Sequence, residues 1–282
     1  MKSIQQILRN AAPHWVGDGF PVRSLLSYSG GNRFDPFLLL DYAGPYEFAP
    51  AEAQRGVGEH PHRGFETVTI VYQGELEHGD SAGNRGTIGP GDVQWMTAAA
   101  GVVHREHHSE RFARAGGVLE MVQLWVNLPA KDKTSPPRYQ EILSARIPVV
   151  ELPDGAGSVR VIAGDFQGTA GPAQTFTPLR LWDLRLASGG RATFEVDDGA
   201  TTLLVVQRGT IVVNGQESVG AVEVVQFDRA GTEFTLEAQQ DAMALVLSGA
   251  PIGEPVAGQG PFVMNTREEI LQAIADFQGG RF

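Results

Sequence analysis

Apolar and polar residues alternate along most of the chain in short runs, and this period of two is typical of β-strands. In the first half such runs cover residues 23–42, 66–72 and 118–128. In the second half the pattern restarts and recurs at residues 179–186, 192–196, 202–206, 210–213, 222–227, 233–237 and 242–247. The pattern predicts an all-β protein in which the two halves use the same architecture, as a weak internal repeat.

Glycine and proline turn signals divide the intervening segments into short strands. Four such signals lie between residues 74 and 92, beginning with Gly74-Glu75 and ending with Gly89-Pro90-Gly91-Asp92. Short strands at this spacing suit an antiparallel sandwich or barrel. Trp95 and Met96 follow the last turn and are expected to fill the barrel core, with a lining role at a site as the alternative.

Only the end of the chain is predicted to be helical. Thr266 followed three residues later by Glu269 forms a capping-box pattern. The preceding segment, residues 253–265, is rich in glycine and is expected to be a long ordered excursion across the surface. Apolar residues then follow at helical spacing, at positions 270, 274 and 277.

The length of the chain suggests two domains. Its 282 residues are 42% hydrophobic, which is enough for two modest cores. Residues 129–138 are polar, contain proline and lack periodicity, so we expect a domain boundary there. We predict a first domain at residues 1–130, a linker at 131–145, and a second domain at 146–282 that includes the helix.

Composition excludes several classes of function. The formal net charge is -11 and no Lys- or Arg-rich block is present, which argues against direct binding of nucleic acid. No stretch approaches the roughly 20 apolar residues of a membrane span, and the N-terminus lacks the features of a signal peptide, so a cytoplasmic address is expected. Cysteine is absent, so any metal must be held by histidine and carboxylate side chains.

All seven histidines lie at or before position 108. His60 and His62 are two residues apart and would share one face of an extended strand, and Glu66 has the same parity. The same face would continue through apolar positions 68, 70 and 72. The histidines are therefore expected at the mouth of an apolar barrel interior, where a charge must be paired or bound to metal.

A second pair of candidate ligands, His104 and Glu106, follows a glycine-rich turn. If its strand lay beside the first, all four groups would meet. Three imidazoles and one carboxylate suit a borderline divalent metal such as Fe, Mn, Ni, Cu or Zn, and an octahedral ion would keep about two positions open for substrate, water or dioxygen. A single His-x-His pair often lies on a protein surface without binding metal, but two pairs of candidate ligands at strand spacing favour a catalytic metal site.

Three motifs resemble the signature of the pirin family of bicupins, namely residues 60–67 (HPHRGFET), 89–98 (GPGDVQWMTA) and 101–106 (GVVHRE). Further matches are residues 34–41 (FDPFLLLD), 127–139 (NLPAKDKTSPPRY) and 260–266 (GPFVMNT). The likeness runs through nearly the whole chain. It implies two cupin β-barrels that face each other, with one metal ion, usually taken as iron, in the N-terminal barrel only.

Carried over residue by residue, the resemblance places the metal ligands on His60, His62, His104 and Glu106. Cupins in general use a glutamate a few residues after His-x-His, which would be Glu66, whereas pirins use the later one. Glu66 is therefore expected to support the ligands or the fold. The C-terminal half contains no histidine, so its barrel is expected to be metal-free.

The remaining histidines are weaker candidates for the site. His107 and His108 follow the second ligand pair and are expected at the rim. His14 and His78 are expected to be exposed or satisfied by ordinary hydrogen bonds. Arg63 would point away from the face that carries the ligands, and is expected to be a structural ion-pair partner.

The resemblance implies two functions. As an enzyme, the protein would be an iron-dependent dioxygenase of the quercetin or flavonol type, in which Glu106 or a nearby carboxylate takes the proton of a substrate hydroxyl. As a regulator, it would sense redox state and bind a transcription factor or metabolic enzyme through an iron-dependent surface. A third hypothesis is that the metal only stabilises the fold and takes part in no reaction. A monomer is expected, because the second barrel can cover what a dimer interface would otherwise cover.

Overall fold

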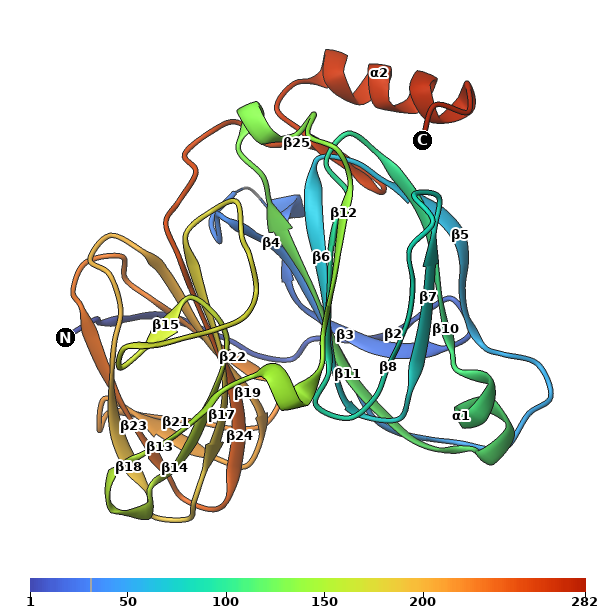
Figure 1. The fold of residues 1–282 in the computed structure, drawn as a ribbon. Helices are drawn as coiled ribbons and strands as arrows, with labels where there is room; N and C mark the ends of the chain where they lie inside the picture. The colour runs from blue at the N-terminus through green and yellow to red at the C-terminus, as the bar shows by residue number, and fades with distance from the viewer. Residues whose placement is uncertain (31) are drawn as a thin grey trace. The chain divides into compact units, whose positions relative to one another are not determined.

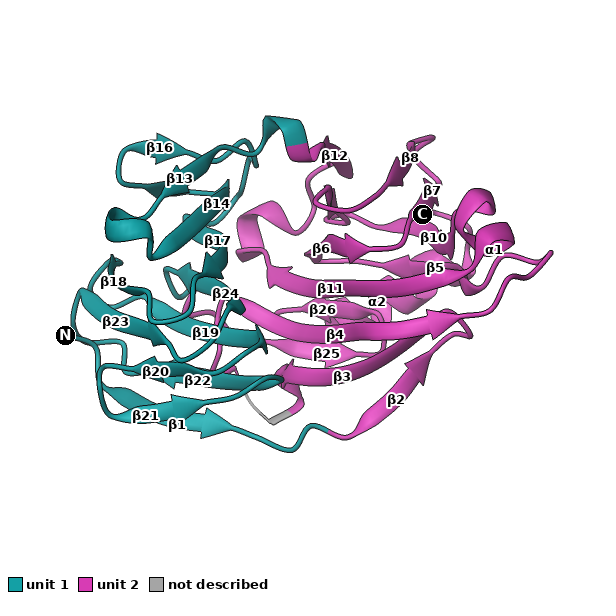
Figure 2. Cartoon of the chain, turned by 90° about the horizontal axis from the view of Figure 1, so that it is seen from below, with its two compact units in different colours: residues 1–11, 145–251 teal, residues 12–144, 252–282 magenta. Residues whose placement is uncertain are grey.

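The computed structural model describes residues 1–30 and 32–282 and is built mainly from β-strands (Figure 1). The chain divides into two compact units (Figure 2). The first, here called the histidine unit, comprises residues 12–144 and 252–282. The second, here called the apolar unit, comprises residues 1–11 and 145–251.

The histidine unit contains two main antiparallel sheets. The larger has the order β12-β9-β6-β11-β4-β3-β2, with β2 at Pro13–Val16, β3 at Phe20–Ser27, β4 at Phe37–Phe48, β6 at Phe65–Gln73, β9 at Val93–Thr97, β11 at Gly117–Asn127 and β12 at Arg138–Ile142. The smaller has the order β5-β10-β7-β8, with β5 at Gly56–His62, β7 at Leu76–Asp80, β8 at Arg85–Ile88 and β10 at Val102–His108.

The apolar unit repeats this arrangement. Its larger sheet has the order β1-β22-β19-β24-β17-β14-β13, with β1 at Ile4–Leu8, β13 at Val149–Glu151, β14 at Gly157–Ala163, β17 at Leu179–Leu186, β19 at Thr201–Arg208, β22 at Glu223–Phe227 and β24 at Ala242–Gly249. Its smaller sheet has the order β18-β23-β20-β21, with β18 at Arg191–Glu195, β20 at Ile211–Val213, β21 at Glu217–Val219 and β23 at Glu233–Ala238. The predicted internal repeat is therefore confirmed at the level of strand order.

Smaller elements complete the chain. Two short hairpins are formed by β15 (Asp165–Phe166) with β16 (Thr169–Ala170), and by β25 (Ala257–Gln259) with β26 (Phe262–Met264). Single 3-10 turns lie at Tyr28–Gly30, Ala130–Asp132, Ser144–Arg146 and Pro153–Gly155. The α-helices are α1 at Glu110–Ala115 and α2 at Arg267–Gln278.

The C-terminal helix α2 begins where the sequence predicts. The Thr266 hydroxyl accepts the backbone N–H of Glu269 at 3.2 Å, and the Glu269 carboxylate accepts the N–H of Thr266 at 2.9 Å, which completes the capping box. The prediction that no other helix exists was wrong. Helix α1 has only six residues, too few for a periodic pattern, and Ser109 caps it by accepting the N–H of Phe112 at 3.0 Å.

The compact units differ from the expected division at 1–130 and 146–282. Strand β1 pairs with β22 of the apolar unit, and residues 252–282, including α2, belong to the histidine unit. Part of the expected linker is also structured, since β12 pairs with β9. An edge strand or terminal segment joins whichever sheet offers unpaired backbone groups, and local sequence pattern does not encode that choice.

Candidate metal centre

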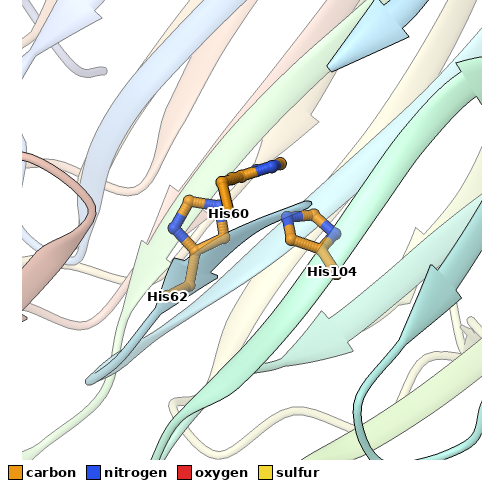
Figure 3. A group of neighbouring side chains, drawn as sticks. All are labelled: His60, His62 and His104. Carbon is orange, nitrogen blue, oxygen red and sulfur yellow. The ribbon is translucent and has the colours of Figure 1, made fainter. Parts of the chain in front are cut away.

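Three imidazoles converge where β5 and β10 pair (Figure 3). His60 lies directly opposite His104 in the antiparallel register, and their ring centroids are 4.2 Å apart. One ring nitrogen from each of His60, His62 and His104 lies within 4.8 Å of the others. The structure thus brings together the three histidines that the sequence selects, because residues two apart on each strand face the same side.

Hydrogen bonds orient two of these rings. His60 Nδ1 is 2.8 Å from the carbonyl oxygen of Gly58, and His62 Nδ1 is 3.3 Å from that of Pro261. A carbonyl oxygen only accepts, so each Nδ1 carries the proton and each Nε2 keeps its lone pair. Such carbonyl contacts are how proteins fix the tautomer of a metal-ligating histidine.

The third ring, His104, provides the sharpest test of whether the residues fit a metal ion. Its side chain is 1% exposed, and neither ring nitrogen has a hydrogen-bond partner among the described residues. A buried polar group without a partner costs about 1–3 kcal/mol. A divalent ion held by the three rings would satisfy one of these nitrogens, so the donor set fits a metal.

All three rings are neutral at physiological pH. Burial lowers the pKa of His62 to about 3, with the neighbouring His60 adding to the effect. Burial likewise lowers the pKa of His60, and lowers that of His104 well below its ordinary value. Neutral imidazole is the form that binds metals, so no proton has to be displaced.

Glu106 lies two residues after His104 on β10 and is buried. Its Oε1 accepts from the Thr69 hydroxyl and the Gln94 amide, both at 3.2 Å. Burial raises the pKa of Glu106 to about 7, against the lowering effect of these two donors. Glu106 lines the same cavity as His60 and His62, although it is outside the group of ligand atoms within 4.8 Å of one another.

Glu66 lies on the other face of its sheet. The expected continuous strand is interrupted at Gly64, where φ is +90° and an added Cβ would lie 1.9 Å from the Val263 carbonyl oxygen. Strand β5 ends at His62 and β6 begins at Phe65 in a different sheet. The parity argument across this turn was therefore wrong.

The register of β6 shows which face looks into the site. Thr67 and Thr69 pair with Trp125 and Gln123 of β11, two residues that line the cavity. The apolar positions 68, 70 and 72 alternate with these and lie on the other face, as Glu66 does. Glu66 Oε1 accepts the Thr97 hydroxyl at 2.6 Å, and burial raises the pKa of Glu66 to about 7.

A mainly apolar cavity adjoins the histidines and encloses about 650 Å³, including the part open to solvent. Its polar residues besides the candidate ligands are Asp41 and Gln123. Its apolar walls come from Val16, Phe20, Val22, Leu39, Val57, Met121 and Trp125.

Comparison with known proteins identifies the family. The Pirin family model matches residues 19–126, and the model of the Pirin C-terminal cupin domain matches residues 181–282. The chain belongs to the pirin family. The predicted fold class, with an N-terminal and a C-terminal cupin domain, is thereby confirmed.

This pirin has relatives that match it over its full length. It is 59% identical to a Pseudomonas aeruginosa protein provisionally named as a quercetin 2,3-dioxygenase, covering 100% of this chain and 99% of the relative. It is 42% identical to a pirin-like protein of Caulobacter vibrioides, with 99% of each chain covered. The crystal structure of a quercetin 2,3-dioxygenase from Acinetobacter baumannii superposes with a TM-score of 0.98 at 53% identity, covering 100% of this chain and 98% of that one. Neither α-helix in the described part of this pirin is long and apolar enough to cross a membrane.

Of the remaining histidines, His78 lies beside the cluster of three, with its ring centroid 5.4 Å from that of His104. His108 was expected at the rim but is buried, with its Nε2 2.9 Å from the Gly19 carbonyl oxygen and its ring packed among Phe20, Phe48 and Phe112. Its parity on β10 turns it inward, as for His104. His78 is buried and hydrogen-bonded, and His14 is exposed, which agrees with expectation.

Arg63 and the two core candidates lie as predicted. The Arg63 guanidinium donates to Asp276 Oδ2 at 2.7 Å and stacks 4.4 Å from the centroid of Phe282. Trp95 and Met96 are fully buried. Arg63 therefore ties the ligand loop to the C-terminal segment.

Two residues that position the ligands could not be found from sequence patterns. Pro261 orients His62, although it is remote along the chain. Buried Lys133 donates to the carbonyl oxygens of Gly64 at 2.6 Å and Val263 at 3.0 Å. The only sequence signal for either was its place in a motif shared with pirins.

Proposed function

We propose that this pirin is a metal-dependent dioxygenase that opens the ring of a flavonol with dioxygen. One divalent ion, for which iron is the first choice and Mn, Ni, Cu and Zn are alternatives, is held by His60, His62, His104 and Glu106. The observation that carries the proposal is the buried His104, whose unpartnered nitrogens lie in a cluster of neutral imidazoles beside an apolar cavity. The names of its relatives support the reaction type.

The bound metal would supply Lewis acidity and the redox chemistry of dioxygen. The protein's own contribution begins with binding. The Trp125 ring lies 5.2 Å from the His62 ring, so an aromatic ligand in the cavity would pack beside the histidines. The apolar walls exclude water, and Asp41 and Gln123 offer hydrogen bonds to substrate hydroxyl groups.

Glu106 is the proposed proton acceptor as well as a ligand. As a base beside the metal, the Glu106 carboxylate would remove the proton of a flavonol hydroxyl. Thr69 and Gln94 hold one of its oxygens in place. The other oxygen has no hydrogen bond within the described residues, which leaves one lone pair for the metal and one for the proton.

The deciding experiment is oxygen uptake by the purified protein, reconstituted separately with Fe(II), Mn(II), Ni(II) and Cu(II), on quercetin. We expect metal-dependent uptake that His62→Ala abolishes, because His62 is a buried ligand. Circular dichroism of the variant controls for folding. Stoichiometric metal binding without uptake for any of the four metals would refute the dioxygenase and leave the redox-regulator prediction as the next hypothesis.

A further inference from the structure

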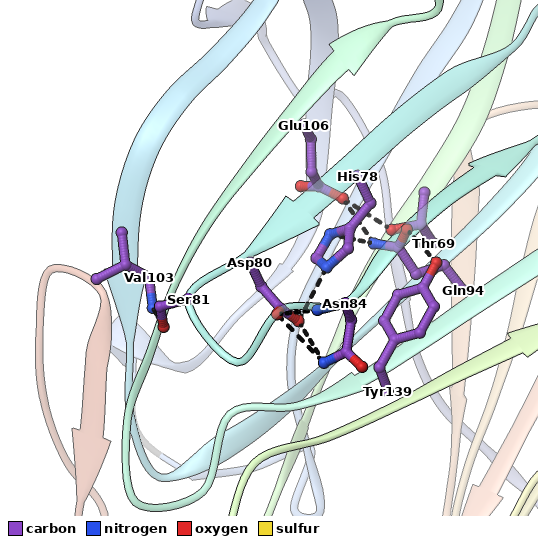
Figure 4. Close-up of polar contacts among 9 residues, drawn as sticks. All are labelled: Thr69, His78, Asp80, Ser81, Asn84, Gln94, Val103, Glu106 and Tyr139. Atoms are coloured by element: carbon purple, nitrogen blue, oxygen red, sulfur yellow. Dashed lines mark hydrogen bonds and ion pairs between the residues drawn. The ribbon is translucent and has the colours of Figure 1, made fainter.

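A buried chain of hydrogen bonds runs from Glu106 to Asp80 through Gln94 and His78 (Figure 4). Gln94 Nε2 lies 3.2 Å from Glu106 Oε1 and 3.3 Å from His78 Nδ1. His78 Nε2 lies 3.2 Å from Asp80 Oδ2, and the Tyr139 hydroxyl lies 3.3 Å from Gln94 Oε1. The chain therefore links a proposed ligand to the turn that joins β7 and β8.

The donor and the acceptor of each hydrogen bond can be assigned by starting from Asp80, at one end of the chain of hydrogen bonds. Asp80 accepts the backbone N–H and the side-chain amide of Asn84, each at 2.9 Å. An ionised carboxylate only accepts, so His78 donates from Nε2. An imidazole that donates from Nε2 keeps a lone pair on Nδ1, which faces the Gln94 amide at 3.3 Å as an acceptor.

Gln94 can then adopt only one amide orientation. Its NH2 group must donate to both His78 Nδ1 and Glu106 Oε1, while its oxygen accepts the Tyr139 hydroxyl. A flipped amide would turn its oxygen toward two acceptors. Both buried acceptors would then lose their donor, so the flipped form is disfavoured.

Tyr139 is itself held in place. Its ring stacks on that of His78, with centroids 4.8 Å apart and planes 16° from parallel. The absence of a side chain at Gly86 makes room for it, since an added Cβ would lie 2.3 Å from the Tyr139 oxygen. The acceptor side of the Gln94 amide is thus fixed by packing as well as by hydrogen bonding.

We infer that Gln94 is a positioning residue that determines which oxygen of Glu106 is presented to the metal. Thr69 also donates to Oε1, but its one proton is shared with Gln123 Oε1 at the shorter distance of 2.7 Å. Gln94 is therefore the main hydrogen-bond donor to Glu106 Oε1. By occupying Oε1 it leaves Oε2 for the metal, so Glu106 binds through one oxygen. The inference rests on the proposed ligand role of Glu106.

Metal-free protein titrated with Co(II), whose visible absorption reports its ligands, tests this without any turnover. Gln94→Leu should weaken Co(II) binding by about 10- to 100-fold, the usual effect of losing a residue that orients a ligand. It should also shift the Co(II) spectrum in the same direction as Glu106→Gln. The double variant should bind no more weakly than Glu106→Gln alone, because both changes remove one interaction.

Two milder variants keep the test decisive if Gln94→Leu does not fold. Tyr139→Phe keeps the ring stack, removes only the hydroxyl, and should give the same spectral shift with a smaller loss of affinity. Thr69→Val, the matched control, should change the spectrum less than Gln94→Leu. Wild-type affinity and spectrum in the Gln94 and Tyr139 variants, or additive losses in the double variant, would overturn the inference.

The same titration separates this inference from the dioxygenase proposal. If Glu106→Gln leaves Co(II) binding unchanged, Glu106 is not a ligand and the positioning role of Gln94 falls with it. If the Co(II) spectra change as expected while quercetin-dependent oxygen uptake is absent, the positioning role stands and only the dioxygenase reaction is refuted.

Discussion

The two four-stranded sheets, β5-β10-β7-β8 and β18-β23-β20-β21, share one strand order but carry different inward-facing residues. In the histidine unit His104 of β10 pairs with His60 of β5. In the apolar unit Phe234 of β23 pairs with Phe194 of β18, and the two rings stack with centroids 5.5 Å apart. Aromatic rings complete their own packing, whereas the imidazoles leave buried nitrogens that a ligand must satisfy.

The same contrast continues along the neighbouring positions. Glu106 lies opposite His78, while Leu236 of β23 lies opposite Val213 of β20. The apolar unit thus closes a hydrophobic core where the histidine unit keeps a polar network. One fold can therefore enclose a filled apolar core or a cluster of histidines that fits a metal ion, and the side chains on a single strand pair decide between them.

Exchanging these side chains gives the largest expected effect. His104→Phe should abolish stoichiometric binding of a divalent metal and, with it, any oxygen uptake, since a central ligand is lost. The metal-free variant should unfold at a higher temperature than the metal-free wild type, because two unpartnered nitrogens are removed. Metal analysis and thermal unfolding in chelator measure both effects.

The reverse exchange, Phe234→His, serves as the control. It should destabilise the protein by about 3 kcal/mol by placing a polar ring in an apolar core, and it should create no second metal site. If His104→Phe retained one equivalent of tightly bound metal, the proposed centre would be in the wrong place.

Each unit contains a buried lysine that anchors a terminal segment of the chain, so the two lysines can be compared directly. Lys2 donates to three backbone carbonyls of the apolar unit, including that of Arg229 at 2.6 Å. Lys133 joins Gly64, next to the His62 loop, to Val263. Each substitution to Met should cost about 3 kcal/mol through unsatisfied carbonyls, but only Lys133→Met should also weaken metal binding.

Denaturant unfolding and Co(II) titration of both variants measure this difference. The exposed Lys131→Met is the matched control and should be neutral in both measurements. Equal loss of Co(II) affinity in the Lys2 and Lys133 variants would show that metal binding follows overall stability and not the contact with Gly64.

Local sequence pattern was sufficient for the features that depend on neighbouring residues. Residues 60, 62, 104 and 106 show ligand spacing within their own strands, and Thr266 with Glu269 marks the start of α2. The pairing of the two ligand strands was expected but could not be derived, because it depends on contacts remote in sequence. The resemblance to pirins supplied it.

The failures arise where one residue's backbone conformation or a contact remote in sequence decides the structure. A single glycine at position 64 changes the sheet and the face of the chain, so Glu66 turned out to lie away from the histidines. Each terminal segment packs in the unit other than the one predicted. Edge strands pair through backbone hydrogen bonds, which do not depend on side-chain identity, so the sequence pattern does not indicate the partner. Gln94 and Lys133 act through single hydrogen bonds that leave no periodic signal.

Glu66 offers a pH test of the buried polar groups in the histidine unit. Its pKa is about 7 in the folded protein against 4.5 for the ordinary carboxyl. Between these values the folded state holds a proton that the unfolded state has released, so stability falls as pH rises. The loss is complete above pH 7 and amounts to about 3 kcal/mol.

Glu66→Gln keeps the acceptor for Thr97 and removes the charge. The variant should therefore match the wild type at pH 4.5 and exceed it by about 3 kcal/mol at pH 8, in urea unfolding with chelator present. A variant less stable than the wild type at pH 8 would mean that the ionised carboxylate is favourably paired, contrary to its raised pKa.

The smallest expected effect concerns the cavity beside the histidines, where we propose that the substrate binds. Asp41 lines it, with one carboxylate oxygen accepting the Ser24 hydroxyl at 2.5 Å, and burial raises the pKa of Asp41. If this carboxylate holds a flavonol hydroxyl, Asp41→Asn should raise KM about fivefold, the cost of about 1 kcal/mol for weakening one hydrogen bond, while kcat stays within about twofold. Ser24→Ala, which leaves the carboxylate in the cavity, is the control and should change KM less. A fall in kcat without a change in KM would instead place Asp41 at the reacting atoms, and the substrate would then lie deeper in the cavity than the hydroxyl contact requires.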